Sequence, residues 1–163
     1  MNISKRKGFT LIEMLLFMAI VSFLLIMLTS IFTASLNVQK ESEATSNVQQ
    51  DGSYLISRLA YDTARAQSIT IPSSLGTQTN NLQLVIDGTN YTYALNNGTL
   101  TITDNIGTDQ LNNFDTTVSD LTFKRLGNSG GKNTIQINFR VSSKVQQSTG
   151  YEFKNFQTTV GLR

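Results

Sequence analysis

The chain has 163 residues, a length that suits one compact domain plus an appendage. Three of its thirteen basic residues are Lys5, Arg6 and Lys7, which leaves ten basic against eleven acidic side chains in the remainder. This balance predicts no basic surface and gives no support for direct nucleic-acid binding. The lack of cysteine and histidine excludes disulfides, a thiol nucleophile, a Cys/His zinc site and Ser-His-Asp catalysis.

An uncharged, mostly apolar stretch covers residues 14–39. Since about 20 apolar residues cross a bilayer as a helix, the stretch predicts a membrane-spanning segment. Lys5-Arg6-Lys7 precedes it and only Lys40 follows closely, so the positive-inside bias predicts a cytoplasmic N-terminus with the bulk of the chain outside. A secretory signal peptide is disfavoured because the stretch is too long and no small-residue cleavage site ends it. A plain single-pass anchor accounts for the length and the flanking charges, but it leaves Glu13 unexplained.

Glu13 lies at the beginning of the apolar stretch, at the fifth position after Gly8. A carboxylate in hydrocarbon costs on the order of 3 kcal/mol unless it finds a partner. An acid inside a membrane segment therefore points to a function and to a partner. We expect the partner to be a new N-terminal amine, created by cleavage after Gly8.

The segment Lys5–Leu15 contains a basic leader, then Gly8, Phe9, Thr-Leu-Ile and Glu13. It resembles the leader and cleavage motif of type IV prepilins and type II secretion pseudopilins. The resemblance implies that a prepilin peptidase cuts between Gly8 and Phe9 on the cytoplasmic side and that Phe9 is N-methylated. It also implies that Glu13 neutralises the terminal amine of a neighbouring subunit and sets the axial register of a filament. Many major pilins carry a helix-kinking proline where this chain has Ser30, so a less kinked helix and a minor pilin or pseudopilin are expected.

The helical pattern continues beyond the apolar stretch, because residues 36–67 contain no proline and have one apolar face. One helix is predicted from about Phe9 to about Gln67, with Gly52 as a candidate bend and residues 68–72 as its end. The apolar face comprises Val48, Leu55, Ile56, Leu59, Ala60, Thr63 and Ala64. The charged residues Lys40, Glu41, Glu43, Asp51, Arg58, Asp62 and Arg65 are expected to form a solvated face.

The segment 55–66 is similar to the matching helix of PilW-like minor pilins and J-type pseudopilins, which reads loosely as L-x-x-D-L-x-x-A. Asp62 is present in this chain, but Thr63 replaces the leucine. This resemblance favours a low-abundance subunit over the abundant pilin of a filament shaft.

Alternating apolar residues predict strands over 82–86, 91–95, 100–102, 118–126 and 135–141, and a last strand within 151–160. The turn signals at 87–88 and 96–98 join the first three strands into a meander. One face of the sheet is apolar, and the second half of the helix is expected to cover it. The predicted fold is α+β and pilin-like. A long N-terminal helix, membrane-spanning in its first half and amphipathic in its second, packs on a C-terminal antiparallel β-sheet.

Two further patterns are interpreted as structural. Tyr91 and Tyr93 read as core or sheet surface in preference to a stacking platform for bases or sugars. The cluster Asp104–Asp109 reads as a turn in preference to a calcium site, because it lacks the spacing of a calcium loop.

The predicted organisation is a prepilin leader at 1–8, a transmembrane or filament-core helix at 9–35, an amphipathic helix with its connector at 36–72, and a β-rich head at 73–163. The predicted function is that of a structural subunit of a type IV pilus, a type II secretion pseudopilus or a competence pilus. No catalytic residue, metal or cofactor is predicted. Expected partners are the prepilin peptidase, other pilin-like subunits, an inner-membrane assembly platform and, before assembly, the membrane. The chain would begin as a single-pass membrane protein and end in an extracellular or periplasmic filament.

Two other functions remain open at this point. A filament-borne or membrane-anchored adhesin, whose head recognises DNA, a glycan or a surface, would need a cluster of basic and aromatic residues. Its basic candidates are Lys124, Arg125, Lys132, Arg140 and Lys144. An enzyme would need two converging acids. Its candidates Asp87, Asp104, Asp109, Asp115, Asp120 and Glu152 mostly fall at predicted turns.

Overall fold

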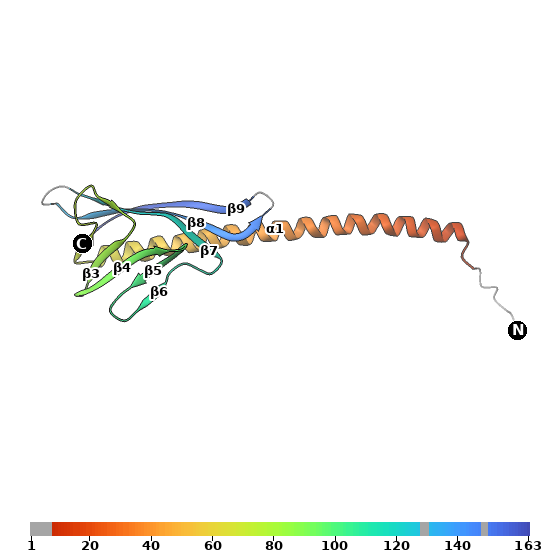
Figure 1. The fold of residues 1–163 in the computed structure, drawn as a ribbon. Coiled ribbons are helices and arrows are strands. Elements are labelled where there is room, and N and C mark those ends of the chain that lie inside the picture. The colour runs from red at the N-terminus through yellow and green to blue at the C-terminus, as the bar shows by residue number, and fades with distance from the viewer. Residues whose placement is uncertain (1–7, 128–130, 148–149) are drawn as a thin grey trace. The chain divides into compact units, whose positions relative to one another are not determined.

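The structure is a computed structural model that describes residues 8–127, 131–147 and 150–163 (Figure 1). It contains one helix, α1 (Leu11–Arg65), and nine strands within these residues. The strands are β1 (Ser68–Ile71), β2 (Gln78–Thr79), β3 (Leu82–Ile86), β4 (Thr89–Asn96), β5 (Thr99–Thr103), β6 (Thr108–Gln110), β7 (Thr116–Leu126), β8 (Thr134–Gln147) and β9 (Gly150–Gly161). The predicted α+β class, with a long N-terminal helix and antiparallel strands, is confirmed.

Helix α1 begins and ends close to its predicted bounds and continues through Ser30, as expected from the lack of proline. The chain divides at Gln39 and Lys40 into two units, Met1–Gln39 and Lys40–Arg163, and each is described by itself. The described part of the first unit consists of the apolar portion of α1, preceded by Gly8, Phe9 and Thr10.

Most hydroxyl groups of the apolar portion donate to a carbonyl oxygen of the helix itself. Ser22 donates to the carbonyl of Met18, and Thr29 donates to that of Leu25, both at 2.8 Å. Ser30 donates to the carbonyl of Ile26 at 3.0 Å. Such bonds remove the penalty that a free hydroxyl would have in a lipid environment.

The second unit contains two antiparallel sheets, so the expectation of a single sheet is wrong. One has the order β1-β3-β4-β5-β6 and the other β2-β7-β8-β9. The predicted meander is β3-β4-β5, and its turns have positive φ at Asp87 and Asn97, as two-residue hairpins require. An alternating apolar pattern predicts where a strand lies, but it does not predict which strands pair with it. The short strands β2 and β6 are polar, so no apolar pattern predicts them.

A buried asparagine joins the two sheets. Asn112, in the segment between β6 and β7, is 4% exposed. Its carbonyl oxygen accepts the Leu100 amide at 2.8 Å, and its amide nitrogen donates to the Thr116 carbonyl at 3.2 Å. Nearby, the Val118 amide donates to the Gly98 carbonyl at 2.9 Å. These bonds hold β5 of one sheet beside β7 of the other.

The C-terminal part of α1 packs on both sheets, and Figure 1 shows β7, β8 and β9 beside it. Val48, Leu55 and Leu59 of α1 are buried, as the apolar face predicts. They share one core with residues of both sheets, among them Leu84 and Ile137. Tyr93 belongs to this core with no exposed surface, so its interpretation as a core residue is confirmed.

Asp62 is buried, which contradicts its expected place on a solvated face. Its side chain has no exposed surface, and the Tyr93 hydroxyl on β4 donates to it at 2.5 Å. Arg58 and Arg65 contact the same carboxylate at 2.6 and 3.1 Å. The expectation failed because a lone carboxylate in a helix pattern reads as solvated. Here the hydroxyl of the buried Tyr93 and two arginines, whose side chains reach solvent, make its burial tolerable.

Asp51 is the second correction to the expected solvated face, since it is only 8% exposed. Both of its oxygens accept the backbone amide of Asn113, at 3.2 and 3.1 Å, and the Thr116 hydroxyl donates to it as well. These partners lie far away in the sequence, in the segment that leads into β7. Asp51 therefore fastens α1 to the junction of the two sheets.

Helix α1 continues through Gly52, the candidate bend, without interruption. A Cβ atom at this position would lie 2.0 to 2.6 Å from three ring atoms of Phe156 on β9. Phe156 itself stacks on Phe139 of β8, with ring centroids 5.5 Å apart. The glycine is thus required by the close approach of an aromatic ring to the helix backbone.

Candidate functional site at the start of helix α1

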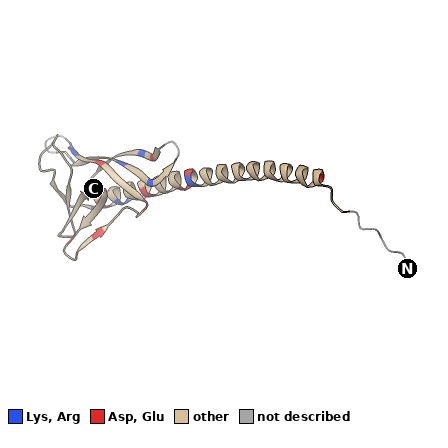
Figure 2. Cartoon of the chain, turned by 45° about the vertical axis from the view of Figure 1, so that its right-hand side comes forward, with Lys and Arg blue, Asp and Glu red and all other residues tan. Residues whose placement is uncertain are grey.

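The apolar portion of α1 is exposed along its whole length. Its most hydrophobic 18-residue window has a mean hydropathy of 2.7 and no buried share. Leu11 is 79% exposed, Phe23 70% and Phe32 64%. Figure 2 shows no charged residue between Glu13 and Lys40. By length and composition this portion can cross a membrane, and an apolar surface of this size requires lipid or protein to cover it.

The start of α1 is a capping box formed by Thr10 and Glu13. The Glu13 amide donates to Thr10 Oγ1 at 3.3 Å, while the Thr10 amide and Thr10 Oγ1 donate to Glu13 Oε2 at 3.2 and 3.3 Å. The threonine and the glutamate satisfy two of the amides that every helix start leaves unpaired. The carboxylate also lies at the positive end of the helix dipole.

Only one of the two carboxylate oxygens of Glu13 takes part in these bonds. Among the residues that the structure describes, no hydrogen bond is made to Oε1. No role for Thr10 was predicted from the sequence. The T-x-x-E pattern directly before an apolar run was the signal that could have identified it.

Gly8 and Phe9 lie before the first helical residue and are exposed, Phe9 to 81%. No atom lies within 4 Å of the Cβ position at Gly8, and its φ is not in the left-handed region. Within the described chain, a residue with a side chain would therefore fit at position 8 as well as glycine does. The basic residues Lys5-Arg6-Lys7 of the predicted leader lie outside the described residues.

The basic residues considered for an adhesin are mostly held by bonds within the head. Arg125 donates to the carbonyl oxygens of Pro72 and Ser73 at 3.0 and 2.8 Å. Arg140 pairs with Asp120 at 3.3 Å, and Lys144 donates to the Phe114 carbonyl at 2.6 Å. Lys124, another candidate, lies on β7, and Lys132 lies between β7 and β8. Arg125, Arg140 and Lys144 are thus held by the head and do not form a free basic patch.

Three of the acids considered for an enzyme have structural roles in the described head. Asp87 occupies a hairpin turn with positive φ. Asp104 Oδ1 accepts the amides of Ile106 and Gly107 at 2.8 and 3.0 Å, which makes the turn that the sequence predicted. These two backbone bonds lower the pKa of Asp104. Asp120 pairs with Arg140, so its charge is already compensated.

Comparison with known proteins gives one match. Residues 3–29 match the family model described as the prokaryotic N-terminal methylation motif. Neither the curated proteins nor the solved structures include one that matches the chain. The matched range contains Gly8, Phe9, the capping box and the first half of the exposed apolar portion.

Proposed function

We propose that this type IV pilin-like chain is a structural subunit that a prepilin peptidase processes and that assembles into a filament through its N-terminal helix. The observation that carries the proposal is the exposed apolar portion of α1, which has a single acid in its first turn, directly behind Gly8 and Phe9. The motif and the α+β fold point to a structural subunit in preference to an enzyme.

The peptidase would cut between Gly8 and Phe9 on the cytoplasmic side, and the new amine of Phe9 would be methylated. Both residues lie outside the helix, where a protease can bind an extended backbone. Because the described fold makes no demand for glycine at position 8, the requirement for it would come from the enzyme, which needs close access to the backbone.

Before assembly the chain would be a single-pass membrane protein. Residues 1–8 would be the leader and 9–35 the membrane segment. Residues 36–72 would form the amphipathic helix and connector, and 73–163 the head. Lys5-Arg6-Lys7 favours a cytoplasmic N-terminus, with the head outside. Assembly would then transfer the apolar surface of α1 from lipid to neighbouring helices, in an extracellular or periplasmic filament.

Glu13 would link one subunit to the next. In the single chain its Oε2 is occupied by Thr10, and its Oε1 is available for another donor among the described residues. The amine of Phe9 from a neighbouring subunit is the expected donor. A carboxylate and an amine that are each costly in hydrocarbon become tolerable as a pair, and the need to pair them would set the axial register.

The low-abundance classes of subunit fit the chain better than a major pilin. Helix α1 has Ser30 in place of a kinking proline and continues through it. The Asp62 that the chain shares with PilW-like and J-type helices binds the head to α1, which a subunit of either class would need. A type IV pilus, a type II secretion pseudopilus or a competence pilus would each supply an inner-membrane assembly platform as a further partner.

Filament incorporation of Glu13→Gln tests the proposal, with co-expressed pilin-like subunits and an assembly platform. The variant should be cleaved normally but be lost from sheared filaments, because glutamine cannot neutralise an amine. Thr10→Ala should be incorporated less than Thr10→Ser, which retains the capping hydroxyl. Glu43→Gln, a change of an exposed acid in the same helix, is the matched control and should assemble normally. Normal incorporation of Glu13→Gln would contradict the proposed role of Glu13.

A further inference from the structure

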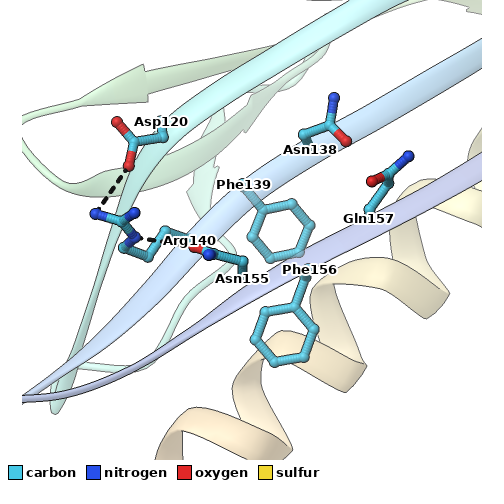
Figure 3. Close-up of a pocket in the computed structure, with 7 residues that line it drawn as sticks. All are labelled: Asp120, Asn138, Phe139, Arg140, Asn155, Phe156 and Gln157. Atoms are coloured by element: carbon cyan, nitrogen blue, oxygen red, sulfur yellow. Dashed lines mark hydrogen bonds and ion pairs between the residues drawn. The ribbon is translucent and has the colours of Figure 1, made fainter.

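Two depressions in the second unit share Asp120. Besides Phe139 and Phe156, the larger, of about 450 Å³, is lined by the polar side chains of Asn138 and Arg140 of β8 and of Asn155 and Gln157 of β9. Figure 3 shows these side chains on the opposite side of the strands from the rings of Phe139 and Phe156, which face the helix.

The second depression has a volume of about 270 Å³ and also includes Asp120. It is lined by Asn80, Asn81 and Thr122, with Leu95 and Leu121 as its apolar members. Five carboxamides therefore surround one carboxylate. We call the two depressions together the amide groove.

The backbone at the centre of the amide groove is strained. Asp120 has a φ of 53°, in the left-handed region that non-glycine residues rarely adopt. It lies in a bulge, where the register of β7 against β8 shifts between Ser119 and Thr122. Bulges re-aim side chains, and strain of this kind is found where a particular side-chain position is needed. Glycine would fit this backbone better, although Asp tolerates positive φ better than most residues and the Asp120 carboxylate pairs with Arg140.

The charges of the amide groove are already compensated. Arg140 is held by three contacts: Asp120 at 3.3 Å, the Asn155 carbonyl oxygen at 2.9 Å, and the ring of Phe153 at 5.0 Å from its centroid. This pairing leaves neither a free cation for phosphate nor a free carboxylate for a metal. The remaining groups are donors and acceptors of neutral carboxamides, of which Gln157 is exposed.

We infer that the amide groove binds a neutral oligosaccharide. A carboxamide offers a donor and an acceptor side by side, which matches the adjacent hydroxyl groups of a sugar ring, and a prearranged Arg–Asp pair does the same. Phe153, which is 56% exposed next to Arg140, offers an apolar face for the C–H side of a sugar. A nucleic acid or an acidic glycan would instead require uncompensated basic residues.

The test measures binding of the full chain, in detergent micelles, to four probes. These are an array of neutral oligosaccharides, purified peptidoglycan sacculi, heparin and duplex DNA. Binding to a member of the array or to sacculi is expected, and these two arms distinguish a surface glycan from a cell-wall strand. Gln157→Ala and Asn138→Ala should each weaken it at least tenfold. Asn105→Ala, which changes an exposed asparagine in the turn after β5, should leave it unchanged.

Asp120→Gly separates binding from folding. Glycine accepts the positive φ, so this variant should melt at a higher temperature than the wild type while binding at least tenfold more weakly. Failure of the neutral probes to bind, preference for heparin or DNA, or unchanged binding in the groove variants would each overturn the inference. Assembly does not enter this test, so its failure would leave the proposed function standing.

Discussion

At the scale of single residues, Asp62 shows how the head is fixed to the C-terminal part of α1. A carboxylate with no exposed surface accepts the hydroxyl of Tyr93, from the centre of a sheet, and pairs with two arginines of its own helix. Burial, and then the hydrogen bond to Asp62, raises the pKa of Tyr93, so the phenol remains a donor in the folded state.

Asp62→Ala should destabilise the head by about 3 kcal/mol, because it leaves the Tyr93 hydroxyl buried without an acceptor. Asp62→Asn should cost less, since it retains an acceptor and since Arg58 and Arg65 are 39% and 36% exposed and can turn to solvent. Urea unfolding of the full chain in micelles, followed by tyrosine fluorescence, measures the free energy of unfolding of both variants. Glu43→Ala, an exposed acid on the same helix, should change stability by less than about 0.5 kcal/mol. Equal stability of Asp62→Ala and the wild type would contradict this account.

Gly52→Ala should destabilise the head by about 1 to 3 kcal/mol, because the added methyl group would overlap the ring of Phe156. At an exposed helix position the same change would stabilise the fold by about 1 kcal/mol. The sign of the change in stability therefore shows whether the Phe156 ring lies against Gly52 or the position is exposed. The change should cost less in a Phe156→Leu background, which makes room for the methyl group. A double-mutant cycle on thermal unfolding measures this coupling, and a higher melting temperature for Gly52→Ala alone would refute it.

Asp104 should make the turn between β5 and β6 sensitive to acid. Backbone amides lower its pKa below the ordinary value of 3.8, so the charged form is favoured in the fold. Its stabilising effect should be complete above pH 3.8 and be lost as the pH falls through the lower folded-state pKa. Carboxyl NMR titration should place its midpoint below 3.8, and the Ile106 and Gly107 amide shifts should follow it. A midpoint at or above the ordinary value would mean that these bonds do not form in solution.

At the scale of elements, the sequence predicted those helices and strands that have a periodic pattern of apolar residues. Helix α1, the meander β3-β4-β5 and the long strands β7 and β8 all have continuous apolar patterns. It did not predict the division into two sheets, because alternation carries no information about which strands pair. The edge strands β2 and β6 are short and polar, and they form through backbone bonds to neighbours that the sequence does not identify.

The sequence also did not predict the polar contacts between distant elements. Asp51 and Asp62 have the local pattern of a solvated face, and only their partners on the β6–β7 segment and on β4 explain their burial. At the start of α1 the capping box was not predicted either, although it is formed by neighbours in sequence and its T-x-x-E pattern could have identified it. Local chemistry could be predicted there, whereas contacts between distant segments required the structure.

At the scale of the whole molecule, the chain combines two units with different solvent requirements. The first presents an apolar helical surface that water cannot accommodate, and the second has an ordinary core and a polar surface. A membrane can satisfy the first unit before assembly, and a bundle of like helices can satisfy it afterwards. Cleavage behind Gly8 would create the amine that we propose as the partner of Glu13 in the filament.

Intact mass measurement after co-expression with a prepilin peptidase tests this account most directly. The product should begin at Phe9 and carry one additional methyl group, and Gly8 substituted by a bulky residue should leave the full-length chain. A chain that retains residues 1–8 in the presence of an active peptidase, shown active on a known prepilin in the same cells, would contradict the account.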